Sequence, residues 1–325
     1  MPNVKQALSS MEGAARDAEL LGQFVWWGTS NACIKPAELA DLFREHGLDP
    51  SKHLPEPPSR KLAFRRAVES AIAGERGMTR AKLVDDASET TYGIRLDRAD
   101  ELGQRVDAVQ FARVTLVPHP TKPEGLFLTD NEEHLIVQEI KRGITHFSQN
   151  FVSDDIRRAI KSVLISAHAV PVTGRSWQAC FVPSYSKDTV TTLARIVARI
   201  TNNYGSAGKQ TFTLAPVPAG DEWRQIGEQA ARSEFGSKID AAAEELASYQ
   251  ERLEDHLRLV RESDLNGTEY RGKGPRASAL SSRLEEYKKL KEKIVSFSDA
   301  LNFKAEDLLE KLDGVSKKVG EMVGQ

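Results

Sequence analysis

Cysteine is scarce in this chain, since Cys33 and Cys180 are the only two among 325 residues. Neither has a second Cys or a His beside it at the spacing of metal ligands. This scarcity argues against a disulfide framework and against a cysteine-based metal site. We expect two reduced thiols in a cytoplasmic protein.

Long apolar runs are also lacking. No stretch approaches the ~18 apolar residues that a membrane-spanning helix needs. The first 22 residues contain no basic start followed by an apolar block. We therefore expect neither a membrane span nor an export signal.

The motifs of common catalytic sites are missing too. No HExxH, GxSxG or paired CxxC occurs, and Gly272-Lys273-Gly274 lacks the preceding strand and the following Ser or Thr of a phosphate-binding loop. We therefore predict a protein that is not an enzyme, with no catalytic residue, no metal and no cofactor. An enzyme of unrecognised class is the alternative, in which His119, between two prolines, would act as a base beside a carboxylate.

The chain does contain a regular apolar repeat of seven residues near its C-terminus. Such a repeat is typical of a coiled coil, and the glycine-rich stretch 267–275 interrupts it. We predict two long helices, at 222–263 and from 277 almost to the end, that form an antiparallel hairpin. Pairing of this seam with another subunit is the alternative. The repeat runs downstream of the break through Leu280, Tyr287, Ile294, Leu301, Leu308, Val315 and Met322.

The segments before the repeat predict an α+β fold. Residues 1–77 are expected to form a mostly helical N-terminal module, with helices at 4–22, 36–48 and 60–73 around a strand-like Phe24–Trp27. Residues 78–218 are expected to form an α+β body with a three-stranded antiparallel meander at 81–117, further helices and a hairpin at 170–182. Residues 219–325 are the coiled-coil helical hairpin.

One segment has an uneven charge. Residues 150–210 carry eight basic and three acidic side chains, although the whole chain has a net charge of −2. Basic residues beside an aromatic side chain on a sheet suit single-stranded nucleic acid, because bases stack while phosphates are neutralised. The alternative is that the aromatics are core and the basic residues only solvate the surface. The candidate contacts are Arg157, Arg158, Lys161, Arg175 and Trp177, with Arg271, Lys273 and Arg276 in the loop between the long helices.

Candidate protein-interface residues come from two places. Adjacent tryptophans are usually core, but an exposed one can anchor a partner. The seam of a coiled coil can bind another chain. The candidates are Trp26, Trp27, Leu280, Tyr287, Ile294, Leu301 and Leu308.

Four stretches resemble a known family. FVWW at 24–27 is followed by KPAELADLFREHGLDP at 35–50 and KLAFRRAVES at 61–70, and GRSWQACFVPS occurs at 174–184. With the long helical C-terminus, this succession resembles a family of uncharacterised proteins from bacteria and their phages. The resemblance implies a prokaryotic or phage origin and carries over no activity or site residue.

These observations lead to a functional hypothesis. We expect a non-enzymatic assembly or adaptor protein whose coiled-coil arm binds another copy or a different protein. Nucleic-acid binding through residues 150–210 is the first alternative, and an enzyme of unrecognised class is the second.

Overall fold

The computed structural model describes residues 20–29, 32–73, 75, 77–86, 88–99, 105–119, 122–173, 176–204, 211–266, 272, 274 and 277–323. These residues fall into two compact units. The first comprises residues up to 28, 163–197 and 211–325, and the second comprises 29–162 and 198–210. The predicted segments 1–77, 78–218 and 219–325 group the chain differently. The predicted helix at 4–22 lies mostly outside the described residues, and a strand begins at Leu20.

The first unit contains a four-stranded antiparallel sheet in the order β10-β1-β9-β8. The central strand β1 is buried on both faces, because Phe24 and Val25 point to opposite sides and are 5% and 0% exposed. Gly22 lies where β1 approaches β9 so closely that a Cβ would stand 2.2 Å from the carbonyl oxygen of Val182. The close approach of the two strands therefore leaves no room for a side chain at position 22. The strands are β1 (Leu20–Gly28), β8 (Val170–Thr173), β9 (Ser176–Pro183) and β10 (Thr211–Pro218).

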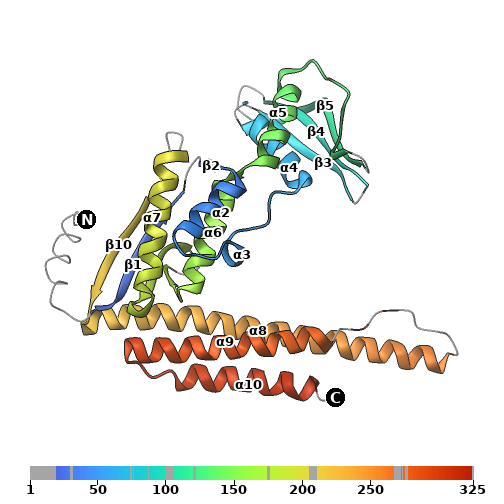
Figure 1. Cartoon of the computed structure of the whole chain (residues 1–325). Helices are drawn as coiled ribbons and strands as arrows, with labels where there is room; N and C mark the ends of the chain where they lie inside the picture. The colour runs from blue at the N-terminus through green and yellow to red at the C-terminus, as the bar shows by residue number, and fades with distance from the viewer. Residues whose placement is uncertain are drawn as a thin grey trace. The chain divides into compact units, whose positions relative to one another are not determined.

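A helical arm packs against this sheet. Helices α8 (Asp221–Leu265), α9 (Ala277–Leu301) and α10 (Glu306–Val323) lie side by side (Figure 1). Three fully buried phenylalanines connect the arm to the sheet, with Phe297 of α9 at 5.4 Å from Phe235 of α8 and 6.4 Å from Phe181 of β9 between ring centroids. The predicted long helices and their packing are confirmed.

The second long helix is shorter than predicted, because the chain reverses after Leu301. Asn302 adopts a left-handed conformation with φ of 51°, and the Phe303 N–H donates to the Ser298 carbonyl at 3.1 Å. This six-residue closure is a helix-ending Schellman motif, in which Asn is a tolerated substitute for Gly. The Ser298 hydroxyl also donates to the Phe303 carbonyl at 2.7 Å. The hairpin is therefore a three-helix arrangement, and Leu301 and Leu308 belong to different helices.

Arg232 of α8 holds this reversal in place. Its guanidinium donates to both carboxylate oxygens of Asp307, at 3.0 and 2.9 Å, and to Glu228 at 2.7 Å. It also donates to the Lys304 carbonyl and lies over the Phe303 ring. Both carboxylates raise the pKa of Arg232, so the guanidinium is charged at any physiological pH.

The second unit contains a four-stranded meander, β3-β4-β5-β6, rather than three strands. Helices α4 and α5 pack against each other and share a core with the sheet. His134 caps the N-terminus of α5, and the Asp130 carboxylate accepts from the Arg113 N–H. The remaining elements are β2 (Cys33–Ile34), α2 (Pro36–Glu45), α3 (Pro50–His53), α4 (Arg60–Ala73), β3 (Met78–Asp85), β4 (Thr90–Ala99), β5 (Arg105–His119), β6 (Lys122–Thr129), α5 (Leu135–Gln149) and β7 (Phe151–Val152).

Two further helices are divided between the units. Helix α6 (Ser153–Ser166) and helix α7 (Lys187–Tyr204) each contribute residues to both, and the one-turn helix η1 (Ser184–Ser186) precedes α7 in the first unit. The α+β class predicted from the sequence is confirmed, with antiparallel sheets, helices and long packed C-terminal helices. None of the described helices combines the length and apolar character needed to cross a lipid bilayer.

Burial of the arm's seam within one chain leads to a stability prediction. Ile294 is 0% exposed, and replacing it with Ala should lower the free energy of unfolding by about 3 kcal/mol through the cavity it leaves. Val295, its 42%-exposed neighbour, is the matched control, and Val295→Ala should change little. Chemical denaturation followed by circular dichroism measures both.

The same experiment at several protein concentrations shows whether the seam is covered by its own chain or by another subunit. A seam covered by its own chain gives a midpoint that is independent of concentration, whereas an obligate intermolecular seam gives one that rises with it. A rising midpoint would contradict the intramolecular arm.

Candidate functional site

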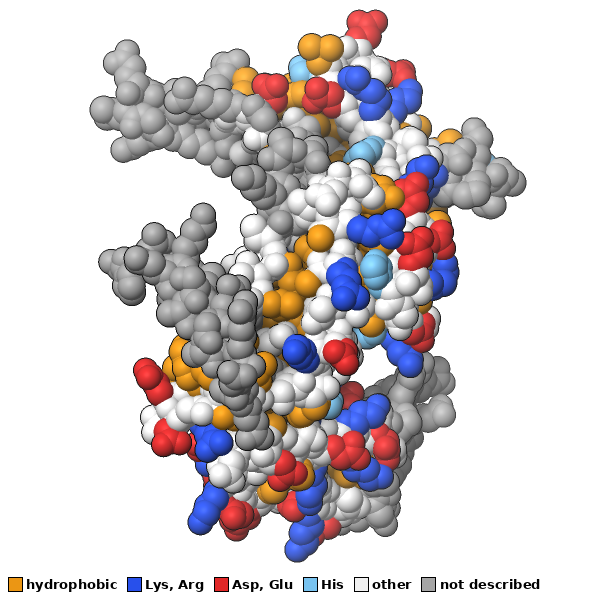
Figure 2. Space-filling model, turned by 60° about the vertical axis from the view of Figure 1, so that its left-hand side comes forward, with side chains coloured by type: hydrophobic (Ala, Val, Ile, Leu, Met, Phe, Trp, Pro, Cys, Tyr) orange, Lys and Arg blue, Asp and Glu red, His pale blue; other side chains and the backbone are white. Residues whose placement is uncertain are grey.

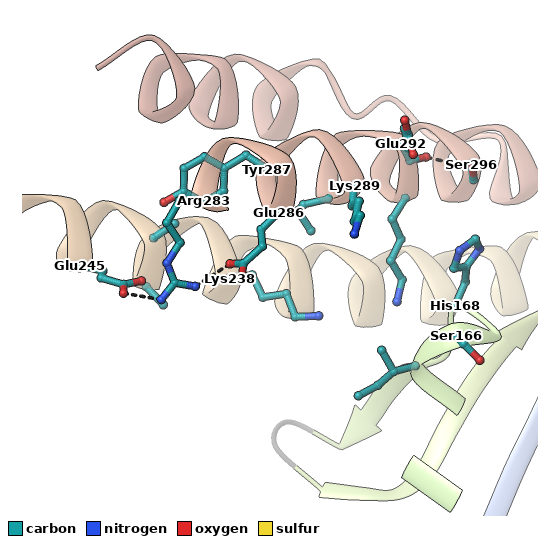
Figure 3. Close-up of a pocket in the computed structure, with 15 residues that line it drawn as sticks. Ser166, His168, Lys238, Glu245, Arg283, Glu286, Tyr287, Lys289, Glu292 and Ser296 are labelled. Carbon is teal, nitrogen blue, oxygen red and sulfur yellow. Dashed lines mark hydrogen bonds and ion pairs between the residues drawn. The ribbon is translucent and has the colours of Figure 1, made fainter. Parts of the chain in front are cut away.

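A groove runs along the arm where the chain from α6 to β8 meets α8 and α9, and it has a volume of about 700 Å³ (Figure 3). All of it belongs to the first unit. The small side chains Ala241 and Ala242 of α8 leave space between the helices, and Tyr287 and Leu290 of α9 add apolar surface. Ile165 at the end of α6 is 42% exposed and lines the groove as well.

One end of the groove carries a closed ion-pair network. Arg283 of α9 donates to Glu286 at 2.5 Å and also to Glu245 of α8 (Figure 3). Both carboxylates raise the pKa of Arg283. Because two carboxylates share one guanidinium, this end has a net negative charge.

The other end contains amines. Lys238 of α8 and Lys293 of α9 both line it. Burial, followed by the charge of Lys238, lowers the pKa of Lys293 to about 8, and Glu234 opposes that shift. Glu234 itself accepts from Lys238 at 2.8 Å. Lys293 Nζ donates to the Ala169 carbonyl at 3.5 Å, which is long for a hydrogen bond. At neutral pH its half-buried ammonium is mostly charged and weakly bound.

His168 borders the amine end because α6 ends there. It adopts a left-handed conformation with φ of 58°, and the Ala169 N–H donates back to the Leu164 carbonyl at 2.8 Å. His168 Nδ1 lies 3.1 Å from the Tyr185 hydroxyl. Burial raises the pKa of Tyr185 to about 12, so this hydroxyl stays protonated at neutral pH. Burial, followed by the charge of Lys293, lowers the pKa of His168 and favours the neutral ring.

These groups make the groove suited to binding. It presents an apolar floor, a negative end and an amine end, which is the arrangement that orients an amphipathic ligand. Within the described residues, no group of three or more His, Cys, Asp or Glu side chains could hold a metal ion.

The sequence did not identify this groove, because its parts lie far apart in the chain. His168 and Lys293 are brought together by the packing of the arm on the sheet. One local signal pointed to it. The run Ala241-Ala242-Ala243 in α8 provides small side chains where a helix surface is open to close approach.

Two predicted nucleic-acid contacts have partners inside their own unit. Arg157 donates to the Thr29 hydroxyl and carbonyl, both at 2.9 Å, and to Asp154 at 2.8 Å. Arg158 donates to Asp155 at 2.9 Å. Their geometry is that of side chains that hold the N-terminus of α6 to a neighbouring segment.

Asp155 is the centre of that network. It is 1% exposed and accepts two hydrogen bonds from Arg66 of α4, at 2.7 and 2.9 Å, in addition to Arg158 and the Val152 N–H. A buried carboxylate of this kind needs all its partners, because its desolvation is otherwise uncompensated. Asp154 and Asp155 both lie in the first turn of α6.

The other predicted contacts are dispersed. Lys161 is an exposed residue of α6 in the second unit, and the partly buried Trp177 lies on β9 in the first. Figure 2 shows acidic and basic side chains interspersed over the face it presents. Four predicted contacts, Arg175, Arg271, Lys273 and Arg276, lie outside the described residues.

The predicted interface residues are mostly interior. The arm's own helices and the sheet bury the five seam residues and leave each of them at most 7% exposed. Trp27 is 7% exposed as well, whereas Trp26 is 43% exposed. Within this chain the seam residues and Trp27 occupy core positions, and Trp26 is the candidate with an accessible face. The five seam residues are Leu280, Tyr287, Ile294, Leu301 and Leu308.

Two remaining candidates for chemistry lie in the second unit. His119 is the last residue of β5 and pairs in register with Lys122, and it is not among the residues that line the groove. Cys33 Sγ lies 3.5 Å from His146 Nε2, a contact that the sequence did not indicate. Burial raises the pKa of the Cys33 thiol, which keeps it protonated and unreactive at neutral pH.

Comparison with known proteins gives one match. The model of a family of unknown function, DUF6744, matches residues 20–325. The chain belongs to this family. No match was found among curated proteins or among solved structures. The sequence predicted membership of a family without a known activity, and DUF6744 is a family of unknown function.

The buried carboxylate of this DUF6744 protein leads to a testable outcome. Asp155→Ala should lower the free energy of unfolding by about 3–5 kcal/mol, because it leaves the Arg66 guanidinium without its partner. Asp154→Ala is the matched control, since the Asp154 side chain is 67% exposed and its loss should change stability by no more than about 1 kcal/mol. Equal effects in urea denaturation would show that Asp155 is not the centre of the network.

The lowered pKa of Lys293 makes the free energy of unfolding depend on pH in a defined direction. Its folded pKa of about 8 lies below the ~10.4 of an unfolded lysine. Between these values the unfolded chain binds more protons, so Lys293 makes the free energy of unfolding rise with pH from about 8 to about 10. Subtracting the curve of Lys293→Met from that of the native chain removes the groups common to both. A flat difference would contradict the depressed pKa.

Proposed function

We propose that this protein is a non-enzymatic assembly or adaptor protein whose arm seats an amphipathic helix of a partner protein in the groove. The observation that carries the proposal is the groove itself, an apolar channel with charged ends between α8 and α9. The intermolecular role moves from the heptad seam to this groove, because the seam residues form the core of the arm.

The shape of the groove favours a helix. Lys238 and Glu245 are seven residues apart on α8, which corresponds to two helical turns and about 10 Å. Alanines at 241 and 242 allow a third backbone to approach α8 and α9 to the usual distance of ~8–10 Å between packed helices. The occupant would complete a second face of the arm, opposite the one that α10 covers.

The charges favour one orientation of that helix. The groove is negative near Glu245 and Glu286 and positive near Lys238 and Lys293. The C-terminal end of a helix carries partial negative charge, so it would lie at the lysine end. A matching partner has basic residues near one end of its apolar face and acidic residues near the other.

Nucleic acid is the alternative that the sequence raised. Among the described residues the two arginines expected to contact it already bind Thr29, Asp154 and Asp155. We therefore prefer a protein partner. A bacterial or phage origin and a cytoplasmic location, both expected from the sequence, are part of the same proposal.

Site-specific photo-cross-linking in cells that produce the full chain tests this function. A benzoylphenylalanine at Ala241, which is exposed in the groove, should cross-link to one protein, and mass spectrometry should locate the cross-link in an amphipathic helix. Lys317, exposed on α10, is the control position and should give no such product. Equal products at both positions, a nuclease-sensitive product, or a cross-link to a second copy of this chain would overturn the choice of a partner protein.

A further inference from the structure

The amine end of the groove has more cationic groups than the neighbouring acids neutralise. Lys238, Lys289 and Lys293 all line the groove. Glu234 binds Lys238, and Glu292 lines the groove on α9. Two acids thus face three amines. His168 lies beside them from the corner between α6 and β8.

Lys293 has the most unusual surroundings of these amines. An ammonium has three N–H donors. The described structure gives Lys293 one long contact, 3.5 Å to the Ala169 carbonyl. Its amine is half-buried, faces the charge of Lys238, and lies beside a histidine that burial keeps neutral. A group with these neighbours gains from an anion that supplies acceptors and relieves the repulsion.

The surface next to these amines is apolar. Ile165, Leu290 and Ala242 line the same groove. A free inorganic anion would leave this surface wet, whereas an anion attached to an apolar body would cover it and gain from burial. The site therefore selects an amphiphile with its charge at one end.

We propose that Lys238 and Lys293 together bind a carboxylate that is attached to an apolar body lying along Ile165 and Leu290. This inference rests on the proposed function and deepens it, because it names the group of the partner that the groove recognises. The carboxylate would come from an acidic side chain or the C-terminus of the partner helix, or from a small organic acid of the same chemistry.

Binding of this kind is coupled to protonation of Lys293. The groups that face it are Lys238 and Glu234 on α8, His168 at the α6–β8 corner, and Lys289 and Glu292 on its own helix. Only the charged amine attracts a carboxylate. Affinity should therefore be nearly constant up to about pH 8 and then fall as Lys293 loses its proton, towards the weaker binding expected of Lys293→Met.

Octanoate is the probe for the test, with octanol as its uncharged match, in calorimetric titrations of the full chain at pH 7 and pH 9.5. We expect octanoate to bind at least tenfold more tightly than octanol at pH 7. Lys293→Met and Lys238→Met should each weaken octanoate binding by roughly tenfold, the usual effect of a charge-assisted hydrogen bond. Lys288→Met, on the solvent side of α9 and paired with Glu285, should leave it within twofold.

Three outcomes would overturn the inference. They are equal binding of octanol and octanoate, equal loss with Lys288→Met, and affinity that is unchanged at pH 9.5. Because Lys238 is exposed, its variant keeps the test valid even if Lys293→Met were to alter the fold.

The source of the carboxylate is found by combining this probe with the cross-link at Ala241. If octanoate suppresses the cross-link and Lys293→Met lowers its yield, the carboxylate belongs to the partner. If octanoate binds with the expected selectivity and no cross-link forms, the ligand is a small acid, and the proposed function fails while this inference stands. If the cross-link forms but octanoate does not bind selectively, the proposed function stands and this inference fails.

Discussion

The contact of Phe297 with Phe235 and Phe181 is the interaction on which the first unit depends. These rings bring α9, α8 and the sheet together at one point, and none of them is exposed. Because Lys293 precedes Phe297 by one helical turn, the same contact places its amine beside the start of β8. The position of the groove follows from how the arm is packed on the sheet.

The reversal after Leu301 has a second effect on the arm. By folding α10 back, the chain covers the seam with its own residues, so the arm has no need of another chain for its core. The groove on α8 and α9 stays open on the surface of the arm. A seven-residue repeat is usually a sign of association between chains, but here its residues pack within one chain as the core of the arm.

Much of the fold followed from local patterns in the sequence. The heptads identified buried residues of the arm, and the glycine-rich stretch at 267–275 marked the end of the first long helix. The sequence did not predict the end of α9 at Leu301, because the seven-residue repeat continues across the turn. The turn also contains no glycine, since a left-handed Asn302 and the Ser298 hydroxyl close it instead. The meander was predicted with three strands over 81–117, and the structure adds a fourth, β6, at Lys122–Thr129.

The candidate site could not be read from the sequence in the same way. Its lysines are ordinary residues of polar helix faces, and the lowered pKa of Lys293 arises from burial and from the charge of Lys238 on another helix. The basic segment shows a second limit of the sequence. Two of its basic side chains, Arg157 and Arg158, form ion pairs within their own helix, because the acids that bind them stand one turn away on that helix.

The pairing of β1 has a consequence for synthesis of the chain. Val25 pairs with Cys180 and Leu214, so the central strand is translated long before either of its neighbours. At ~5–20 residues per second, roughly 10–40 s pass before the sheet can close. During this interval the apolar FVWW run is exposed on the ribosome, where a chaperone or a transient contact within the nascent chain would have to shield it from aggregation.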